Sequence, residues 1–197
     1  MGSGERPSMV TPFEALFPAL QPQSYQVTSP TDAAYNCIAW AAGDTQTWWW
    51  PDADELAYWP AGASRAETVA AFVIAFNTLG YAPCAGDELE AGFEKVALFA
   101  DTQGRLLHAA RRLPSGRWTS KMGELEDIEH GLHDLAGAAY GSVVQVLKRP
   151  VGGPQARQPG RPKGYPGCPR SQGRVGRLGR LTSRRASPMA RRRPSFC

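Results

Sequence analysis

Cys37 comes directly after Asn36 in the stretch YNCIAWAAG, which predicts a short helix over residues 37–42 that ends at Gly43. Asn favours the cap position of a helix because its side-chain oxygen accepts a hydrogen bond from an unpaired backbone N–H. A cysteine in the first turn is favoured as the thiolate, because the helix dipole and the free amides lower its pKa from about 8.5 toward neutrality. The same amides can hold an oxyanion. Cys37 is therefore a candidate nucleophile.

Two other interpretations of Cys37 stay open from the residues alone. The stretch at residues 29–32, Ser-Pro-Thr-Asp, is also a good capping sequence, and a helix that began there would place Cys37 in mid-helix, without the advantage of the first turn. Free cysteine is also among the most often buried residue types, so a cysteine in an Ala-rich helix can be a packing residue. Cys84 has no base near it in the sequence, and we expect it to be inert.

A thiolate nucleophile needs a base that can protonate the leaving group, and His is the usual choice near neutral pH. The chain has three histidines. His108 lies in an expected strand after KVALFAD, from which a rigid sheet can present it to the start of the helix. His130 and His133 lie in a polar segment, and we expect them to face solvent. The residues thus predict a pair formed by Cys37 and His108.

The elements that would position this pair follow from the periodicity of the chain. Four prolines restrict residues 11–30 to an arm with one short helical piece. The stretch SRAETVAAFVIAFNTLGY predicts a helix that starts with a capping box of Ser64 and Glu67 and ends at Gly80. Short strands are expected at residues 93–101, 105–113, 117–123 and 140–150, with one or two helical turns at 124–137. Helices packed on a small antiparallel sheet make an α+β domain.

The loop GDTQTWWWPDADELAYWP carries four of the six tryptophans. These side chains either line a groove that stacks on a sugar or grips a peptide, or they close a core beneath the loop. We expect the second role for at least two of them. No pair of cysteines has the C-x-x-C spacing and no acidic cluster has the spacing of a calcium loop, so we expect no metal or cofactor.

The charge is divided unevenly along the chain. From Val151 onward there are twelve Lys and Arg and no Asp or Glu, so residues 1–150 hold ten of the 22 basic residues and all 18 acidic ones. A segment with so few aliphatic residues cannot offset its ordering entropy, and we expect a disordered tail over residues 151–197. Such a tail either binds nucleic acid through counterion release or is the product of a shifted reading frame in a GC-rich gene.

Hydropathy gives the expected location. The N-terminus lacks an apolar run long enough for a signal peptide, and no stretch approaches the length of a membrane span. We therefore expect a cytoplasmic protein with reduced thiols and no membrane partner.

A helix opened by Asn-Cys and followed by a sheet with His on its second strand resembles the papain-like cysteine hydrolases, above all the compact NlpC-type peptidases. The stretches YNCIAWAAGDTQTWWWPD, GFEKVALFAD, LLHAARRLPSGRWTSKMG and DIEHG are also similar to an uncharacterised bacterial domain family that we associate with that fold. The resemblance covers roughly residues 13–150. It leaves the tail out. Together with the prolines and the charge distribution, it predicts a Pro-rich arm at 1–30, a papain-like domain at 31–150 and a basic disordered tail at 151–197.

The resemblance also implies roles. Cys37 would be the nucleophile and His108 the base, with Ser120 as the residue that orients the imidazole. Asp127 and Glu129 are competing orienters, because Ser120 is not the His, Asn or Gln of NlpC-type enzymes. The implied function is a cysteine peptidase or amidase that cleaves an amide or thioester of a peptide-like or small substrate through an acyl-enzyme. The alternative is a non-catalytic binding or interaction domain of the same fold, with its partner at the tryptophan loop.

Overall fold

A computed structural model of the chain describes residues 12–21 and 23–154. Its centre is one antiparallel sheet of seven strands in the order β1-β6-β5-β4-β3-β7-β2. Every pair of neighbouring strands is antiparallel. The strands are β1 (Gln26–Val27), β2 (Ala82–Cys84), β3 (Phe93–Ala100), β4 (Leu106–Arg112), β5 (Trp118–Lys121), β6 (Asp127–His130) and β7 (Ser142–Pro150).

In the described part of the chain, three short α-helices and one 3₁₀ turn accompany the sheet: α1 (Pro12–Leu16), α2 (Cys37–Ala42), α3 (Val69–Asn77) and η1 (Leu132–Leu135). The expected capping box of α3 is wrong. The helix begins after Thr68, whose hydroxyl accepts a hydrogen bond from the Ala71 amide at 3.4 Å. Glu67 accepts a hydrogen bond from the indole N–H of Trp50 instead, so a contact with the tryptophan loop takes the side chain that the capping box needed.

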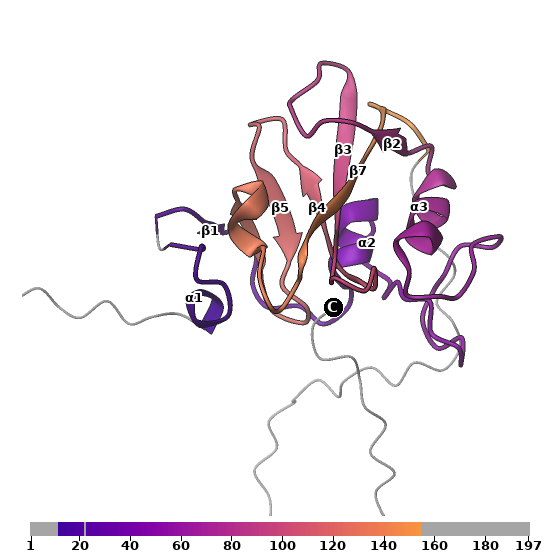
Figure 1. Ribbon diagram of the computed structural model, residues 1–197, viewed down its shortest axis with the longest axis horizontal. Coiled ribbons are helices and arrows are strands. Elements are labelled where there is room, and N and C mark those ends of the chain that lie inside the picture. The colour runs from indigo at the N-terminus through magenta and orange to yellow at the C-terminus, as the bar shows by residue number, and fades with distance from the viewer. Residues whose placement is uncertain (1–11, 22, 155–197) are drawn as a thin grey trace, which may run out of the picture.

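The side chains of each strand alternate between two faces of the sheet, because successive residues of a strand point to opposite sides. On β3, Val96 and Leu98 pack with α2 and α3, and we call this the helical face. Ala97 and Phe99 pack with residues of the N-terminal segment, and we call this the arm face. Figure 1 shows α2 and α3 beside the central strands and the N-terminal segment with α1 and β1 beyond β5. The core therefore consists of two apolar clusters with the sheet between them.

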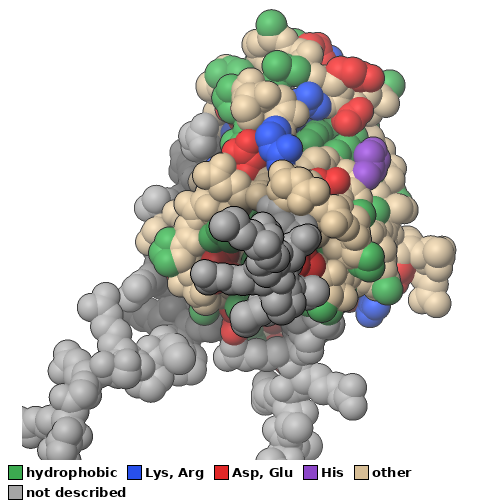
Figure 2. Space-filling view, turned by 90° about the vertical axis from the view of Figure 1, so that its left-hand side faces the viewer, with side chains coloured by type: hydrophobic (Ala, Val, Ile, Leu, Met, Phe, Trp, Pro, Cys, Tyr) green, Lys and Arg blue, Asp and Glu red, His purple; other side chains and the backbone are tan. Residues whose placement is uncertain are grey.

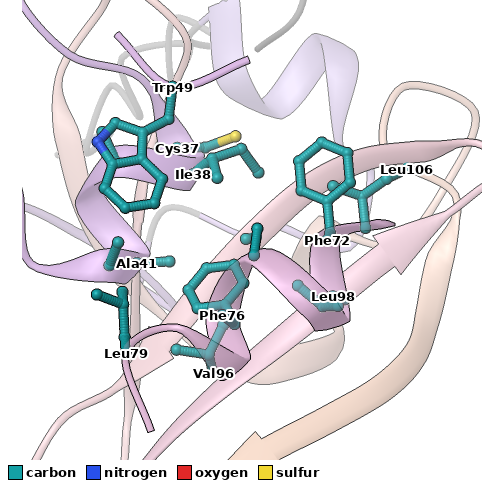
Figure 3. Packing of buried hydrophobic residues seen from close by; sticks show 14 of the residues in the cluster. Cys37, Ile38, Ala41, Trp49, Phe72, Phe76, Leu79, Val96, Leu98 and Leu106 are labelled. Carbon is teal, nitrogen blue, oxygen red and sulfur yellow. The ribbon is translucent and has the colours of Figure 1, made fainter. Parts of the chain in front are cut away.

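The core on the helical face joins both helices to the sheet. Phe72 and Phe76 of α3 lie over β3, and Cys37 and Ile38 of α2 lie beside Trp49 (Figure 3). Three of the four tryptophans in the loop are buried, which confirms the expectation that at least two of them close a core. Their indole N–H groups are bonded internally: Trp49 to Asp44 at 2.9 Å, Trp50 to Glu67 at 3.0 Å and Trp59 to the Ser64 carbonyl at 3.1 Å.

The core on the arm face is closed by the N-terminal segment. Phe13, Phe17 and Leu20 bring their side chains onto it, and the strands supply Ala97, Phe99, Ala110, Trp118, Ile128 and Val146. Figure 2 views the molecule from the side on which Figure 1 draws α1, and hydrophobic side chains there are scattered among polar ones. The apolar side chains of these strands are thus covered by the N-terminal segment that precedes α2.

The α+β class and the small antiparallel sheet are confirmed, but three strands were missed. The segment at 124–137 forms β6 and η1 rather than helix alone, and the short strands β1 and β2 complete the two edges of the sheet. Most of the predicted tail lies outside the described residues, which end at Pro154. Within the described residues, no helix is long and apolar enough to cross a membrane.

Candidate functional site

The helix α2 begins at Cys37, as the sequence predicts. The side-chain oxygen of Asn36 accepts a hydrogen bond from the Ala39 amide at 3.1 Å, and Gly43 ends the helix in the left-handed conformation with φ of 82°. The amide nitrogen of Asn36 donates to the Trp49 carbonyl at 2.7 Å, so the cap is also tied to the tryptophan loop. A helix start at residues 29–32 is wrong, and Cys37 occupies the first turn.

The surroundings of Cys37 are apolar. It belongs to the helical-face cluster together with Phe72, Leu98 and Leu106. Figure 3 shows its sulfur on the side of Phe72 and Leu106. Cys37 is disulfide-bonded in the structure, so any nucleophilic chemistry belongs to the reduced thiol.

His108 lies on the other face of the sheet. It pairs across the ladder with Phe99, and cross-strand partners share a face. Its ring lies 5.4 Å from the ring of Phe99 and stacks on Tyr140 at 4.0 Å, with only 5° between the ring planes. His108, Phe99 and Tyr140 thus belong to the arm face.

The predicted pair is therefore not assembled. Ala109, the next residue of β4, faces α2, so His108 itself points away from the helix. The Nδ1 atom of His108 is buried and has no hydrogen-bond partner among the described residues. The structure brings His108 to Ser120 and leaves Cys37 on the opposite face.

Ser120 contacts His108 as the resemblance implies, and it also contacts a second histidine. The Ser120 hydroxyl lies 2.9 Å from His108 Nε2 and 2.8 Å from His130 Nε2. All three residues have no exposed surface. The expectation that His130 faces solvent is wrong, because β6 pairs with β5 and places its ring on the arm face beside Trp118. His133, in η1, is the exposed one.

The donor and the acceptor of each hydrogen bond among His108, Ser120 and His130 follow from the contact that His130 makes with the Gly131 carbonyl. His130 Nδ1 lies 2.7 Å from the Gly131 carbonyl oxygen, which only accepts, so Nδ1 carries the proton. With the ring neutral, His130 Nε2 accepts from the Ser120 hydroxyl. Ser120 then accepts from His108 Nε2–H, which leaves a lone pair on His108 Nδ1. We call this chain the His-Ser-His chain.

Burial keeps both imidazoles neutral near pH 7. The pKa of His130 is lowered to about 4: burial is the main cause, the Gly131 carbonyl and Asp134 act in the opposite direction, and Arg117 adds a smaller lowering effect. Burial lowers the pKa of His108 well below its ordinary value, and the neighbouring His130 adds to this. The surroundings thus favour the neutral state on which these hydrogen-bond directions depend.

The competing orienters of the imidazole lie elsewhere. Asp127 accepts a hydrogen bond from the Tyr35 hydroxyl at 2.7 Å and lies 4.0 Å from the Lys121 ammonium, which burial holds at a lowered pKa. Glu129 pairs with Arg117 at 3.3 Å. Neither carboxylate has a hydrogen bond to His108. Among the described residues no group of three or more His, Cys, Asp and Glu can hold a metal ion.

Sequence reasoning missed His130 and the strand that carries it. The sequence feature that indicates this strand is the glycine in the turn before it. In the structure Gly123 has a φ of 62°, and the Met122 amide donates to the Glu126 carbonyl at 2.9 Å across the turn. A Gly turn between WTSKM and EDIEH, with Ile128 and His130 two residues apart, is the pattern of a hairpin with one buried face.

The fold and the site define a small α+β domain with one antiparallel sheet between two cores and a buried histidine chain in one of them. The chain belongs to the family described as Domain of unknown function (DUF7689), whose model matches residues 26–148. No curated protein and no solved structure matches it.

Proposed function

We propose that this DUF7689 domain is a non-catalytic binding or interaction module. One observation carries the proposal: the nucleophile and the base of the implied hydrolase lie on opposite faces of the sheet. General acid–base chemistry requires the two groups within hydrogen-bond reach. Turning His108 to the helical face would reverse the alternation of β4 and expel Ala109 from the core that it shares with α2.

A binding module needs an accessible surface with side chains suited to contacts. The tryptophan loop offers little, since Trp49, Trp50 and Trp59 are buried. The half-buried Trp40 of α2 offers more: the Arg111 guanidinium lies 4.1 Å from its ring centre, and its indole N–H donates to Thr119 at 3.3 Å. Trp and Arg are the residue types that contribute most to interfaces. We place the partner contact at Trp40 and Arg111.

Alkylation of Cys37 tests the proposal. The full chain is reduced and treated with iodoacetamide between pH 5 and 9, and modification of Cys37 is quantified on its own peptide by mass spectrometry. The expected rate is the same in the wild type and in His108→Gln, because no ion pair joins the two residues. A rate that stays high well below pH 8 and collapses in His108→Gln would establish a thiolate–imidazole pair and overturn the proposal.

A second candidate function is a papain-like cysteine hydrolase. Two features support it: the Asn36 cap places Cys37 in the first turn of α2, and the Ser120 contact leaves on His108 Nδ1 the lone pair that a base needs. Its test is turnover of dipeptide aminomethylcoumarin amides by the reduced protein. Hydrolysis abolished by Cys37→Ala and by His108→Ala would favour it over the binding module.

A further inference from the structure

The N-terminal segment is held to the sheet at the place where the His-Ser-His chain lies. We define the arm as residues 13–21 and 23–27. The ring of Phe17 lies 4.8 Å from the ring of Tyr140, and Tyr140 stacks directly on His108. The arm therefore rests, through one aromatic ring, on the first member of the chain.

The second attachment of the arm involves the strand of the last member. Among the described residues, strand β1 pairs with β6 alone, through Gln26 with Glu129 and Val27 with Ile128. His130 follows Glu129 in β6. Arg117 also donates a hydrogen bond to the Ser24 carbonyl of the arm. Two backbone pairs and this contact are a weak attachment by themselves, so the docking of the arm depends mainly on the apolar core beneath it.

The groups that face the two imidazoles stabilise the positive charge of an added proton only weakly. The Gly131 carbonyl and Asp134 of η1 favour the charged form of His130, but Arg117 opposes it, and His130 in turn opposes a charge on His108. His108 faces His130, Phe99 and Tyr140, and its Nδ1 has no partner among the described residues. On the arm, Glu14 and Tyr25 bond to each other at 3.4 Å, and the core side chains of the arm are apolar.

We propose that the His-Ser-His chain is an acid-sensitive latch: a proton added to it releases the arm from the arm face while α2 and α3 stay packed on the helical face. A proton on His130 Nε2 removes the acceptor of the Ser120 hydroxyl. A proton on His108 Nδ1 places a charge under Tyr140 without a hydrogen bond. Either event favours the state in which water reaches the rings, and that state requires the arm to leave.

The sign and the range follow from linkage. In the docked state both rings resist protonation, whereas an undocked histidine takes up a proton near its ordinary pKa of about 6.5, so acid favours undocking. The effect begins as the pH falls through about 6.5 and for His130 is complete near its docked pKa of about 4. At pH 5 the undocking equilibrium should rise about 30-fold through His130 alone.

Hydrogen exchange of the full chain tests the latch. Exchange is followed by mass spectrometry at pH 7.5 and pH 5.0, and each rate is divided by the intrinsic rate at that pH to give the opening equilibrium. For peptides that cover the arm we expect a rise of at least about 30-fold at pH 5.0. For peptides that cover α3 we expect no comparable change.

Two variants assign the effect to the chain. His130→Gln cannot titrate but can still accept from Ser120 and donate to Gly131, so it should remove most of the rise. His133→Gln, an exposed histidine three residues away, is the matched control and should keep the rise. Corrected arm exchange that is independent of pH, a rise shared equally by α3, or a rise unchanged in His130→Gln would each overturn the latch. NMR of His130 gives a second readout: a midpoint near 6.5 in the docked chain would overturn it too.

Discussion

The two faces of the sheet use the same strands but differ in how their cores are made. On the helical face the core is apolar and aromatic, and its indole N–H groups bond to fixed acceptors such as Asp44 and a backbone carbonyl. On the arm face three polar side chains are buried in a row, and their hydrogen bonds require two neutral imidazoles. The stability of the helical-face core is therefore insensitive to pH near neutrality, whereas the stability of the arm-face core depends on both imidazoles staying neutral.

The sequence predicted that Cys37 and His108 act as one pair, but the structure places them in different cores, so their roles are separate questions. Cys37 belongs to the core on the helical face and His108 to the core on the arm face, so the role of either residue can be tested without disturbing the other. Substitutions on the helical face should act on stability at every pH. Substitutions in the His-Ser-His chain should change stability and its pH dependence together.

The largest expected effect is on the helical face. Phe72 is fully buried and makes edge contacts with Trp50 at 5.6 Å and with Trp59 at 4.8 Å. Phe72→Ala removes this ring and leaves a cavity, so the free energy of unfolding should fall by about 3–5 kcal/mol. Urea denaturation at pH 7.5 measures it. Ile74→Ala, at a residue of the same helix that is 44% exposed, is the control and should cost well under half as much.

The next effect is on the arm face. Ser120→Ala removes the atom that joins the two imidazoles, and it leaves a buried donor on His108 and a buried acceptor on His130 unpaired. Each unpaired group costs about 1–3 kcal/mol, and the two penalties do not add fully because both groups belong to one hydrogen-bond network, so we expect a loss of about 2–4 kcal/mol in urea denaturation. Ser115→Ala, in an exposed turn, is the control. Equal losses for the two variants would show that the chain contributes nothing to stability.

Much of the helical face could be predicted from the sequence, because its determinants are local. The Asn36 cap, the start of α2 at Cys37 and the burial of the tryptophans depend on neighbouring residues and on the size of aromatic side chains. The strands β3, β4, β5 and β7 follow from β-rich runs between turns. These features need no knowledge of which strands pair.

The arm face could not be predicted in the same way, because it depends on pairing. In RLLHAARRL two consecutive apolar residues lie on each side of His108, so no alternation of apolar and polar residues shows which face His108 takes. The structure decides it through the ladder: Phe99 pairs with His108 and Ala100 with Leu106, so that Leu107 is an extra residue. A shift of one residue would have reversed the face. The inward face of His130 likewise depends on the β5–β6 pairing.

The two helix caps offer a smaller comparison within the helical face. Asn36 is fully buried and bonds to the Ala39 amide and to the Trp49 carbonyl, whereas Thr68 makes one long bond to the Ala71 amide. Asn36→Ala should cost about 2 kcal/mol, because it removes the cap and leaves a buried carbonyl unpaired. Thr68→Ala should cost about 1 kcal/mol. Thermal unfolding of both variants checks the order. The reverse order would mean that the hydrogen bond between Asn36 and the Trp49 carbonyl contributes nothing to stability.

The smallest expected effect concerns the surface that we assign to binding, and it distinguishes a stabilising contact from a binding one. The Arg111 guanidinium lies over the Trp40 ring at 4.1 Å, and burial lowers the pKa of Arg111 without removing its charge near neutrality. A cation–π contact at a partly exposed site is worth about 0.5–1 kcal/mol, so Arg111→Gln should lower the free energy of unfolding by no more than that. Urea denaturation provides the measurement, with Arg105→Gln, an exposed arginine at the loop before β4, as the control. A loss of several kcal/mol would make Arg111 part of the core. A small loss leaves the pair free to serve a partner, because residues that contribute little to folding are the ones that a binding surface can use.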